Sequence, residues 1–268
     1  MARLLGVIFV LANLLAACGG SAPADASPLL VGAASSLEPL FNELGPAFEE
    51  ETGAKVVFVY GSSGSLSAQI AQGAPLDVFV SANQGFIDGL MGEGLIAHDR
   101  QRVFAEGRLV AVVSFTPSRG GTWQSAVTDE RVRFLAIANP EVAPYGAAAR
   151  QALKRAGLWE QLQPKLVYGA NVAQVLQLVQ SGNADVGFIA LAQIAAAPPE
   201  GPQTLLVDSC DHGPLPQVIA SIRSLKAAAR PELAERFWAF VGSPATEATL
   251  RRHGYVPAVD GLADRGCE

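Results

Sequence analysis

The sequence predicts an α/β protein with parallel-type sheets flanked by helices, and three observations support this class. Short apolar runs typical of strands alternate with amphipathic helical patterns along most of the chain. Half of the 268 residues are hydrophobic, which is enough to fill a substantial core. Four short loops each follow a strand-like run and open a helical pattern, as turns between strands and helices do in such folds.

The individual elements follow from local patterns. Strands are expected at short apolar, β-branched runs, which cover residues 29–33, 55–60, 77–81, 109–115, 132–138, 165–168, 185–190, 205–208 and 217–221. Helices are expected where apolar residues recur at helical spacing, often up to a glycine such as Gly53 or Gly157. They cover residues 37–52, 65–72, 84–91, 147–156, 172–181, 191–197, 231–241 and 244–253.

Residues 1–17 have the pattern of a secretory signal peptide. Arg3 supplies a positive charge, and the apolar core from Leu4 to Leu15 is too short to span a membrane. Small residues then precede Cys18, so the signal resembles that of a bacterial lipoprotein, which implies lipidation of the Cys18 thiol. The alternative is an ordinary export signal with an incidental cysteine. Residues 18–28 combine the lipidated cysteine with a flexible tether.

The charge balance restricts the partners. The chain has 19 Lys and Arg against 25 Asp and Glu, and removal of the signal leaves 18 against 25, a net charge of −7. This modestly acidic surface argues against nucleic acid as a partner and against a broad contact with anionic membrane. Any anion site must therefore be local.

Cysteine use fits an exported protein. With Cys18 assigned to lipid, Cys210 and Cys267 remain, and a disulfide between them is one hypothesis for an oxidising compartment. A metal site built on Cys210 and His212 is the alternative. It lacks the paired-ligand spacing of a zinc site.

The four loops form the candidate functional site. They read AASSL at 33–37, YGSSGS at 60–65, NPEVAPYG at 139–146 and GANV at 169–172. The start of a helix offers free backbone N–H groups and the positive end of the helix dipole, both of which favour an anion. None of the loops contains Lys or Arg. The sequence therefore predicts a small oxyanion held by neutral hydrogen-bond donors.

Several longer segments carry a resemblance to a known family. They are VGAASSLEPLFNELGPAFEEETG, VVFVYGSSGSLSAQIAQGAPLDVFVSAN, IANPEVAPYGAAARQALKRAGLWEQLQPKLVYGANVAQVLQLVQSGNADVGFIALAQI and FWAFVGSPATEATLRRHGYV. Together they cover most of the mature chain and resemble the molybdate-binding proteins of ABC uptake systems. The resemblance implies a two-lobed periplasmic binding fold of type II with its ligand in the interlobe cleft. Residues 29–108 with 218–268 would form one lobe, and residues 109–217 the other.

The resemblance also implies a set of ligand contacts made by hydroxyls and backbone N–H groups. These contacts are Ser35, Ser36, Ser63, Tyr145 and the main chain of Val172. Taken alone, each serine is an ordinary helix cap. Some members place a further tyrosine contact where this chain has Ala190, so the Tyr145 hydroxyl is expected to act in its place.

The function implied by the resemblance is capture of molybdate, and of tungstate, by an exported lipoprotein that delivers it to an ABC permease of the inner membrane. The chain would act as a monomer, without a cofactor and without enzymatic activity. A shell made only of donors favours oxyanions that carry no proton, which leaves sulfate as the alternative ligand. A sensor without a transporter is another alternative.

A hydrolase is disfavoured. Residues 61–65, GSSGS, do not fit the Gly-x-Ser-x-Gly nucleophile motif, and the three histidines show no recognisable partner pattern.

Overall fold

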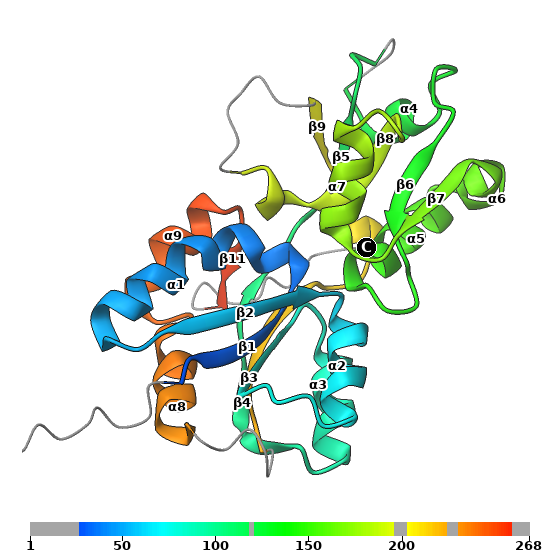
Figure 1. Cartoon of the computed structure of the whole chain (residues 1–268). Coiled ribbons are helices and arrows are strands. Elements are labelled where there is room, and N and C mark those ends of the chain that lie inside the picture. The colour runs from blue at the N-terminus through cyan, green and yellow to red at the C-terminus, as the bar shows by residue number, and fades with distance from the viewer. Residues whose placement is uncertain (1–26, 118–120, 196–202, 224–229, 259–268) are drawn as a thin grey trace, which may run out of the picture.

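Two β-sheets, each flanked by helices, organise the chain into two lobes (Figure 1). The structure is a computed structural model that describes residues 27–117, 121–195, 203–223 and 230–258. The predicted signal peptide, Cys18 and Cys267 lie outside these ranges. The predicted α/β class with two lobes is confirmed. None of the described helices combines the length and apolar character needed to cross a bilayer.

The first sheet has six strands in the order β11-β4-β10-β3-β1-β2. These strands are β1 (Leu29–Ala34), β2 (Val56–Gly61), β3 (Val78–Ser81), β4 (Ile96–Glu106), β10 (Pro216–Ile222) and β11 (Val256–Pro257). The helices of this lobe are α1 (Glu38–Thr52), α2 (Ser63–Ala71), α3 (Gln84–Gly92), α8 (Pro231–Phe240) and α9 (Glu247–Arg252), with the 3-10 turns η1 (Ser35–Leu37) and η5 (Pro244–Thr246).

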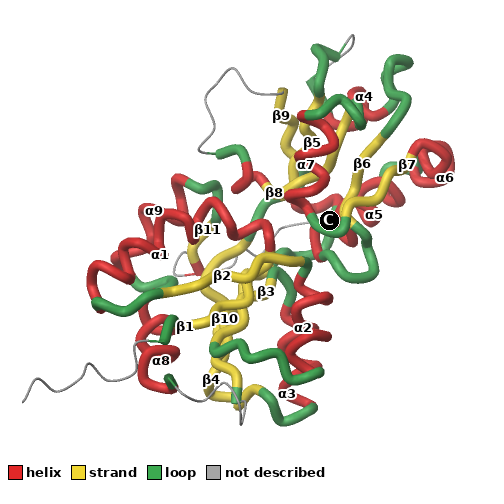
Figure 2. The backbone as a smooth tube through the Cα atoms, viewed as in Figure 1, coloured by secondary structure: helices red, strands yellow, loops and turns green. Residues whose placement is uncertain are grey.

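Both faces of this sheet are covered, as the alternation along β3 shows. Val78 and Val80 pack in the core beneath α1 and α8, whereas Phe79 packs with residues of α2 and α3. Successive strand side chains point to opposite faces, so a fully apolar strand indicates burial on both sides. Figure 2 shows α2 and α3 on one side of the sheet and α1, α8 and α9 on the other.

The second sheet has five strands in the order β7-β6-β8-β5-β9. These strands are β5 (Leu109–Val113), β6 (Leu135–Ala138), β7 (Leu166–Gly169), β8 (Val186–Ala190) and β9 (Gln203–Leu206). The helices of this lobe are α4 (Trp123–Val127), α5 (Pro144–Arg155), α6 (Trp159–Leu162) and α7 (Val172–Gln180), with the 3-10 turns η2 (Gln163–Lys165), η3 (Leu191–Gln193) and η4 (Ser209–Asp211).

Each sheet is mixed, although the strand and helix alternation predicts parallel strands. β1 is parallel to β2 and β3, and β6 is parallel to β7 and β8. However, β10 is antiparallel to β3 and β4, and β5 is antiparallel to β8 and β9. β5 and β10 are the strands that enter one sheet from the other, and a periodic pattern carries no information about their direction.

Sequence patterns also missed β4 and misplaced the ends of several helices. Residues 98–100 in the middle of β4 are polar and exposed, which hides the strand pattern. Helix α5 begins at Pro144 rather than residue 147, since proline fits the first helical position. Helix α2 begins at Ser63 rather than residue 65. The helix expected over 191–197 is only the turn η3 in its described part.

The two segments that link the lobes lie side by side. The chain leaves the first sheet at Glu106 and enters the second at Leu109; it returns to the first sheet at Pro216. The N–H of Gly107 donates to the carbonyl of Leu215 at 2.9 Å, which ties the outgoing segment to the returning one.

An aromatic cluster joins α8 to α1 and β2. The ring of Phe237 lies 5.1 Å from that of Phe48, 5.9 Å from that of Phe41 and 6.1 Å from that of Phe58. Phe237 is completely buried. Tilted and edge-to-face ring pairs of this kind add to the free energy of burial.

Replacing Phe237 with alanine is therefore expected to lower the free energy of unfolding by about 3–5 kcal/mol, because the cavity left beside three rings cannot collapse fully. Urea unfolding followed by circular dichroism measures the loss. The control is Phe134→Ala, at a side chain that is 46% exposed and should change stability little. Equal losses in the two variants would contradict the cluster's role.

Candidate functional site

A small cavity lies where the two lobes meet. It is lined by residues of all four loops and by one residue that follows β3; these are Ala34, Ser35, Ser36, Gly61, Ser62, Ser63, Ala82, Ala143, Pro144, Tyr145, Asn171 and Val172. The centre of a water molecule can move within about 10 Å³ of it. Sites for drug-sized ligands occupy about 300–1,000 Å³. The cavity therefore suits a compact inorganic ion.

Helix starts surround this cavity. Ser62 is the N-cap of α2, where its Oγ accepts from the Ser65 N–H at 3.3 Å. Asn171 is the N-cap of α7, where its Oδ1 accepts from the Gln174 N–H at 3.1 Å. These side chains are occupied in capping. The next residue along each helix, Ser63 or Val172, lies in the first turn and lines the cavity.

Two buried hydroxyls at the cavity have no hydrogen-bond partner among the described residues. They are the Oγ of Ser36 and the phenol of Tyr145, whose side chains are 1% and 2% exposed. A buried hydroxyl without a partner costs about 1–3 kcal/mol, so such pairs usually face a ligand or water. Burial raises the pKa of Tyr145 well above its ordinary value, which keeps the phenol protonated as a donor.

Ser63 offers a third hydroxyl with a fixed orientation. Its Oγ accepts from the N–H of Ala82 at 3.1 Å. The hydroxyl hydrogen of Ser63 is therefore left to donate to another group. Ser62, its neighbour, uses its hydroxyl hydrogen on the Oγ of Ser65 at 2.7 Å.

The lining contains no charged residue. The nearby carboxylate of Glu141 lies outside the cavity, paired with Arg150 at 2.6 Å on an exposed surface. Within the described part of the chain, no group of three His, Cys, Asp or Glu could hold a metal ion. The site can therefore offer hydroxyl and N–H donors, with the dipoles of helix starts, to an anion.

The lobes contact each other beside the cavity. The N–H of Gly64, in the first turn of α2, donates to the carbonyl of Val142 in the second lobe at 2.9 Å. A Cβ at Gly64 would lie 2.9 Å from both the Cα and the carbonyl oxygen of Val142. Only glycine allows this approach of two backbones.

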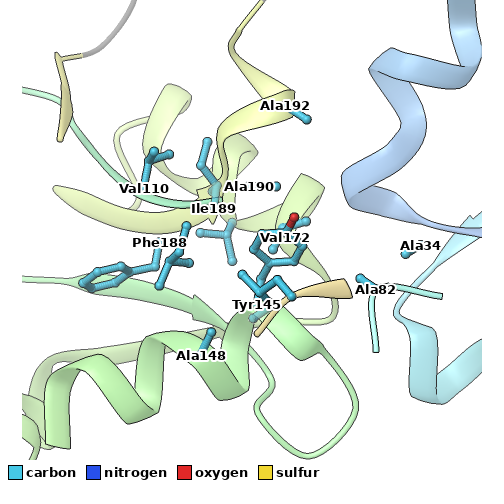
Figure 3. Close-up of a cluster of buried hydrophobic side chains, with 14 of the residues drawn as sticks. Ala34, Ala82, Val110, Tyr145, Ala148, Val172, Phe188, Ile189, Ala190 and Ala192 are labelled. Carbon is cyan, nitrogen blue, oxygen red and sulfur yellow. The ribbon is translucent and has the colours of Figure 1, made fainter. Parts of the chain in front are cut away.

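The structure brings together the five contacts expected from the sequence, since Ser35, Ser36, Ser63, Tyr145 and Val172 all line the cavity. Ala190 does not line it. Ala190 and Tyr145 instead belong to one buried cluster, and Figure 3 shows them with Val172, facing Ala34 and Ala82 of the first lobe.

The expected disulfide is described only in part. Cys210 lies in η4 and is disulfide-bonded, so it does not offer the free thiolate that the metal alternative requires. Its pairing with Cys267 stays a prediction, because Cys267 lies outside the described residues. His212 contacts the carbonyl of Gly213 through its Nδ1 at 2.6 Å.

Two residues that support the site were missed in the sequence. The hydroxyl of Tyr255 donates to the carbonyl of Ser36 at 2.9 Å. Gln217 is completely buried, and after Ser36 it is the second group that lowers the pKa of Tyr145 against the larger effect of burial. Neither lies in a loop that opens a helix, so no local pattern pointed to them.

Comparison with known proteins agrees with this arrangement. The family model for bacterial extracellular solute-binding proteins matches residues 29–256. The molybdate-binding protein ModA of Rhodobacter capsulatus is 33% identical over 238 residues, which cover 89% of this chain and 92% of that protein. ModA of Azotobacter vinelandii is 36% identical over 189 residues, covering 69% and 75% of the two chains.

A solved structure shows the same fold. The periplasmic molybdate-binding protein of Azotobacter vinelandii superposes with a TM-score of 0.79 at 32% identity, covering 85% of this chain and 98% of that one. The relatives are named for binding a solute rather than for a reaction, in agreement with the expectation that the chain is not an enzyme. The chain belongs to the bacterial extracellular solute-binding proteins.

Proposed function

We propose that this protein captures molybdate, and tungstate of the same shape, outside the cytoplasm and delivers it to an ABC permease. The observation that carries the proposal is the interlobe cavity, which is lined by neutral donors and by no charged group. The names of the relatives support molybdate as the ligand.

Each lobe contributes donors to the proposed shell. Ser36 and Ser63 of the first lobe donate hydroxyl hydrogens, with Ser35 beside them. Tyr145 donates its phenol hydrogen and Val172 its backbone N–H from the second lobe. Donors from two lobes can surround a tetrahedral ion only when the lobes are together, so binding stabilises the closed arrangement that Gly64 and Val142 form.

The chemistry of the lining selects ions without a proton. Phosphate near neutral pH carries a proton and needs an acceptor for it, whereas the proposed contacts only donate. Molybdate, tungstate and sulfate carry no proton at this pH. Sulfate therefore remains the ligand against which molybdate must be compared.

The remaining parts of the proposal concern attachment and assembly. Residues 1–17 direct export, lipid on Cys18 anchors the protein, and residues 19–28 tether a monomer to the membrane. Residues 29–108 with 218–268 form the first lobe and residues 109–217 the second. A disulfide between Cys210 and Cys267 would fasten the C-terminal tail to the second lobe, and the disulfide-bonded state of Cys210 supports it.

Calorimetric titration of the detergent-solubilised mature protein with molybdate, tungstate, sulfate and phosphate tests the function. Molybdate and tungstate should bind at least about 100-fold more tightly than phosphate, since a misplaced acceptor or proton in a buried site costs about 3 kcal/mol. Molybdate affinity should be level between pH 6.5 and 8.5, because no lining group titrates there. Equal affinity for molybdate and sulfate would contradict molybdate as the physiological ligand.

Removal of single hydroxyls tests the donors. Ser36→Ala and Ser63→Ala should each weaken molybdate binding by about 10- to 100-fold, the value of a hydrogen bond to a charged group. Ser62→Ala is the matched control, because the Ser62 hydroxyl is occupied by Ser65 and should affect mainly helix stability. An affinity loss for Ser62→Ala as large as for its neighbour would disprove the assigned roles.

Gly64→Ala tests closure of the lobes. Because the new Cβ would overlap the backbone of Val142, the variant should bind molybdate at least about tenfold more weakly, as measured by calorimetry. Its lobes should also remain apart when molybdate is present, as measured by small-angle X-ray scattering. Gly89→Ala in α3, where a Cβ meets nothing within 4 Å, is the control. Wild-type affinity in Gly64→Ala would rule out this backbone contact as part of closure.

A further inference from the structure

The phenol of Tyr145 lies against the segments that join the lobes. A Cβ at Gly107, the residue after β4, would overlap the Tyr145 hydroxyl and would lie 3.0 Å from the Nε2 of Gln217. The Tyr145 hydroxyl and the Gln217 amide therefore share the space above Gly107. Tyr145 comes from the second lobe, whereas Gln217 lies on β10 of the first sheet.

The amide of Gln217 is held in one orientation. Its Nε2 donates to the carbonyl of Leu215 at 2.8 Å, and the same carbonyl accepts from the N–H of Gly107 at 2.9 Å. A carbonyl oxygen can only accept, so the amide nitrogen must face Leu215. The second hydrogen of Nε2 is then free to point toward the phenol oxygen of Tyr145.

The orientation of the amide sets the direction of the interaction. Burial raises the pKa of Tyr145, and contacts first with Ser36 and then with Gln217 lower it in part. A donor to the phenol oxygen stabilises the phenolate and lowers the pKa, whereas an acceptor of the phenol hydrogen would raise it. Because the Nε2 held by Leu215 is the Gln217 atom that lies with the Tyr145 hydroxyl above Gly107, Gln217 faces Tyr145 with a donor and leaves the phenol hydrogen for another acceptor.

We propose that Gln217 is a positioning residue that, with Gly107, orients the Tyr145 hydroxyl so that its hydrogen points to the bound oxyanion. This inference rests on the proposed function for the identity of the ligand. Gly107 lies on the outgoing segment that links the lobes and Gln217 on the returning one. The orientation of the Tyr145 hydroxyl therefore depends on how these two segments are arranged. The Tyr145 hydroxyl would then both bind the ligand and depend for its orientation on the relative position of the lobes.

A double-mutant cycle tests the coupling. Gln217→Met, of similar length but without polar atoms, should weaken molybdate binding about tenfold in the wild-type background and less than twofold in a Tyr145→Phe background. Ser221→Ala is the matched control, because the Ser221 Oγ, like the Gln217 Oε1, is a buried side-chain atom of β10 without a hydrogen-bond partner among the described residues, and it lies near the strand's other end. Additive losses for Gln217 and Tyr145 would overturn the proposal.

Gly107→Ala provides a second, independent test of the proposed positioning of Tyr145. Its Cβ would displace the Tyr145 hydroxyl, so the single variant should bind molybdate at least about tenfold more weakly than wild type. Combined with Tyr145→Phe, which removes the obstructing oxygen, it should bind as Tyr145→Phe alone does. Failure of Tyr145→Phe to mask the Gly107→Ala loss would count against the proposal even where Gln217→Met is unstable.

The ligand-free protein separates this inference from the proposed function. In protein labelled with ¹³C at the tyrosine Cζ, the Tyr145 signal, assigned with Tyr145→Phe, should move in Gln217→Met and stay in place in Ser221→Ala. An unmoved signal overturns the positioning role whatever the ligand. A moved signal in a protein that binds no molybdate supports the positioning role and refutes the proposed function alone.

Discussion

The site depends on one electrostatic constraint, which is that the cavity between the lobes contains no cationic side chain. Negative charge in such a place can be balanced only by oriented dipoles and by hydrogen-bond donors. A helix start supplies both, but its field falls off within one turn. Several starts must therefore converge on one point. The parallel parts of both sheets meet this requirement, because each ends in loops that turn into helices at the interlobe face.

The same constraint accounts for the distribution of serines around the cavity. Ser62 and Ser63 are adjacent and chemically identical, yet one hydroxyl is consumed by capping α2 while the other accepts from Ala82 and can donate elsewhere. Backbone geometry, not residue type, separates a hydroxyl that caps a helix from one whose hydrogen is left to donate into the cavity. The glycine that follows them permits the second lobe to come within hydrogen-bond distance of this turn.

Much of the fold, and five residues that line the cavity, could be predicted from the sequence, because strand-to-helix turns leave local signatures of apolar runs, caps and glycines. Other features left no such signature. β4 was missed because its polar middle is exposed, and the antiparallel direction of β5 and β10 depends on where the chain enters each sheet. Tyr255 and Gln217 reach the site only through tertiary structure, from segments distant along the chain.

The hydrogen bond between Tyr255 and Ser36 has a consequence for the timing of assembly. It joins residues separated by 219 positions, and the first sheet likewise includes two strands from late in the chain, β10 and β11. Contacts so distant in sequence form late, after the entropy of closing a long loop has been overcome. In a chain that lacks its C-terminal part, the loop at residues 33–37 would therefore lack the hydrogen bond from Tyr255. The loop that carries Ser36 therefore reaches its final form only when the C-terminal segment has joined the first sheet.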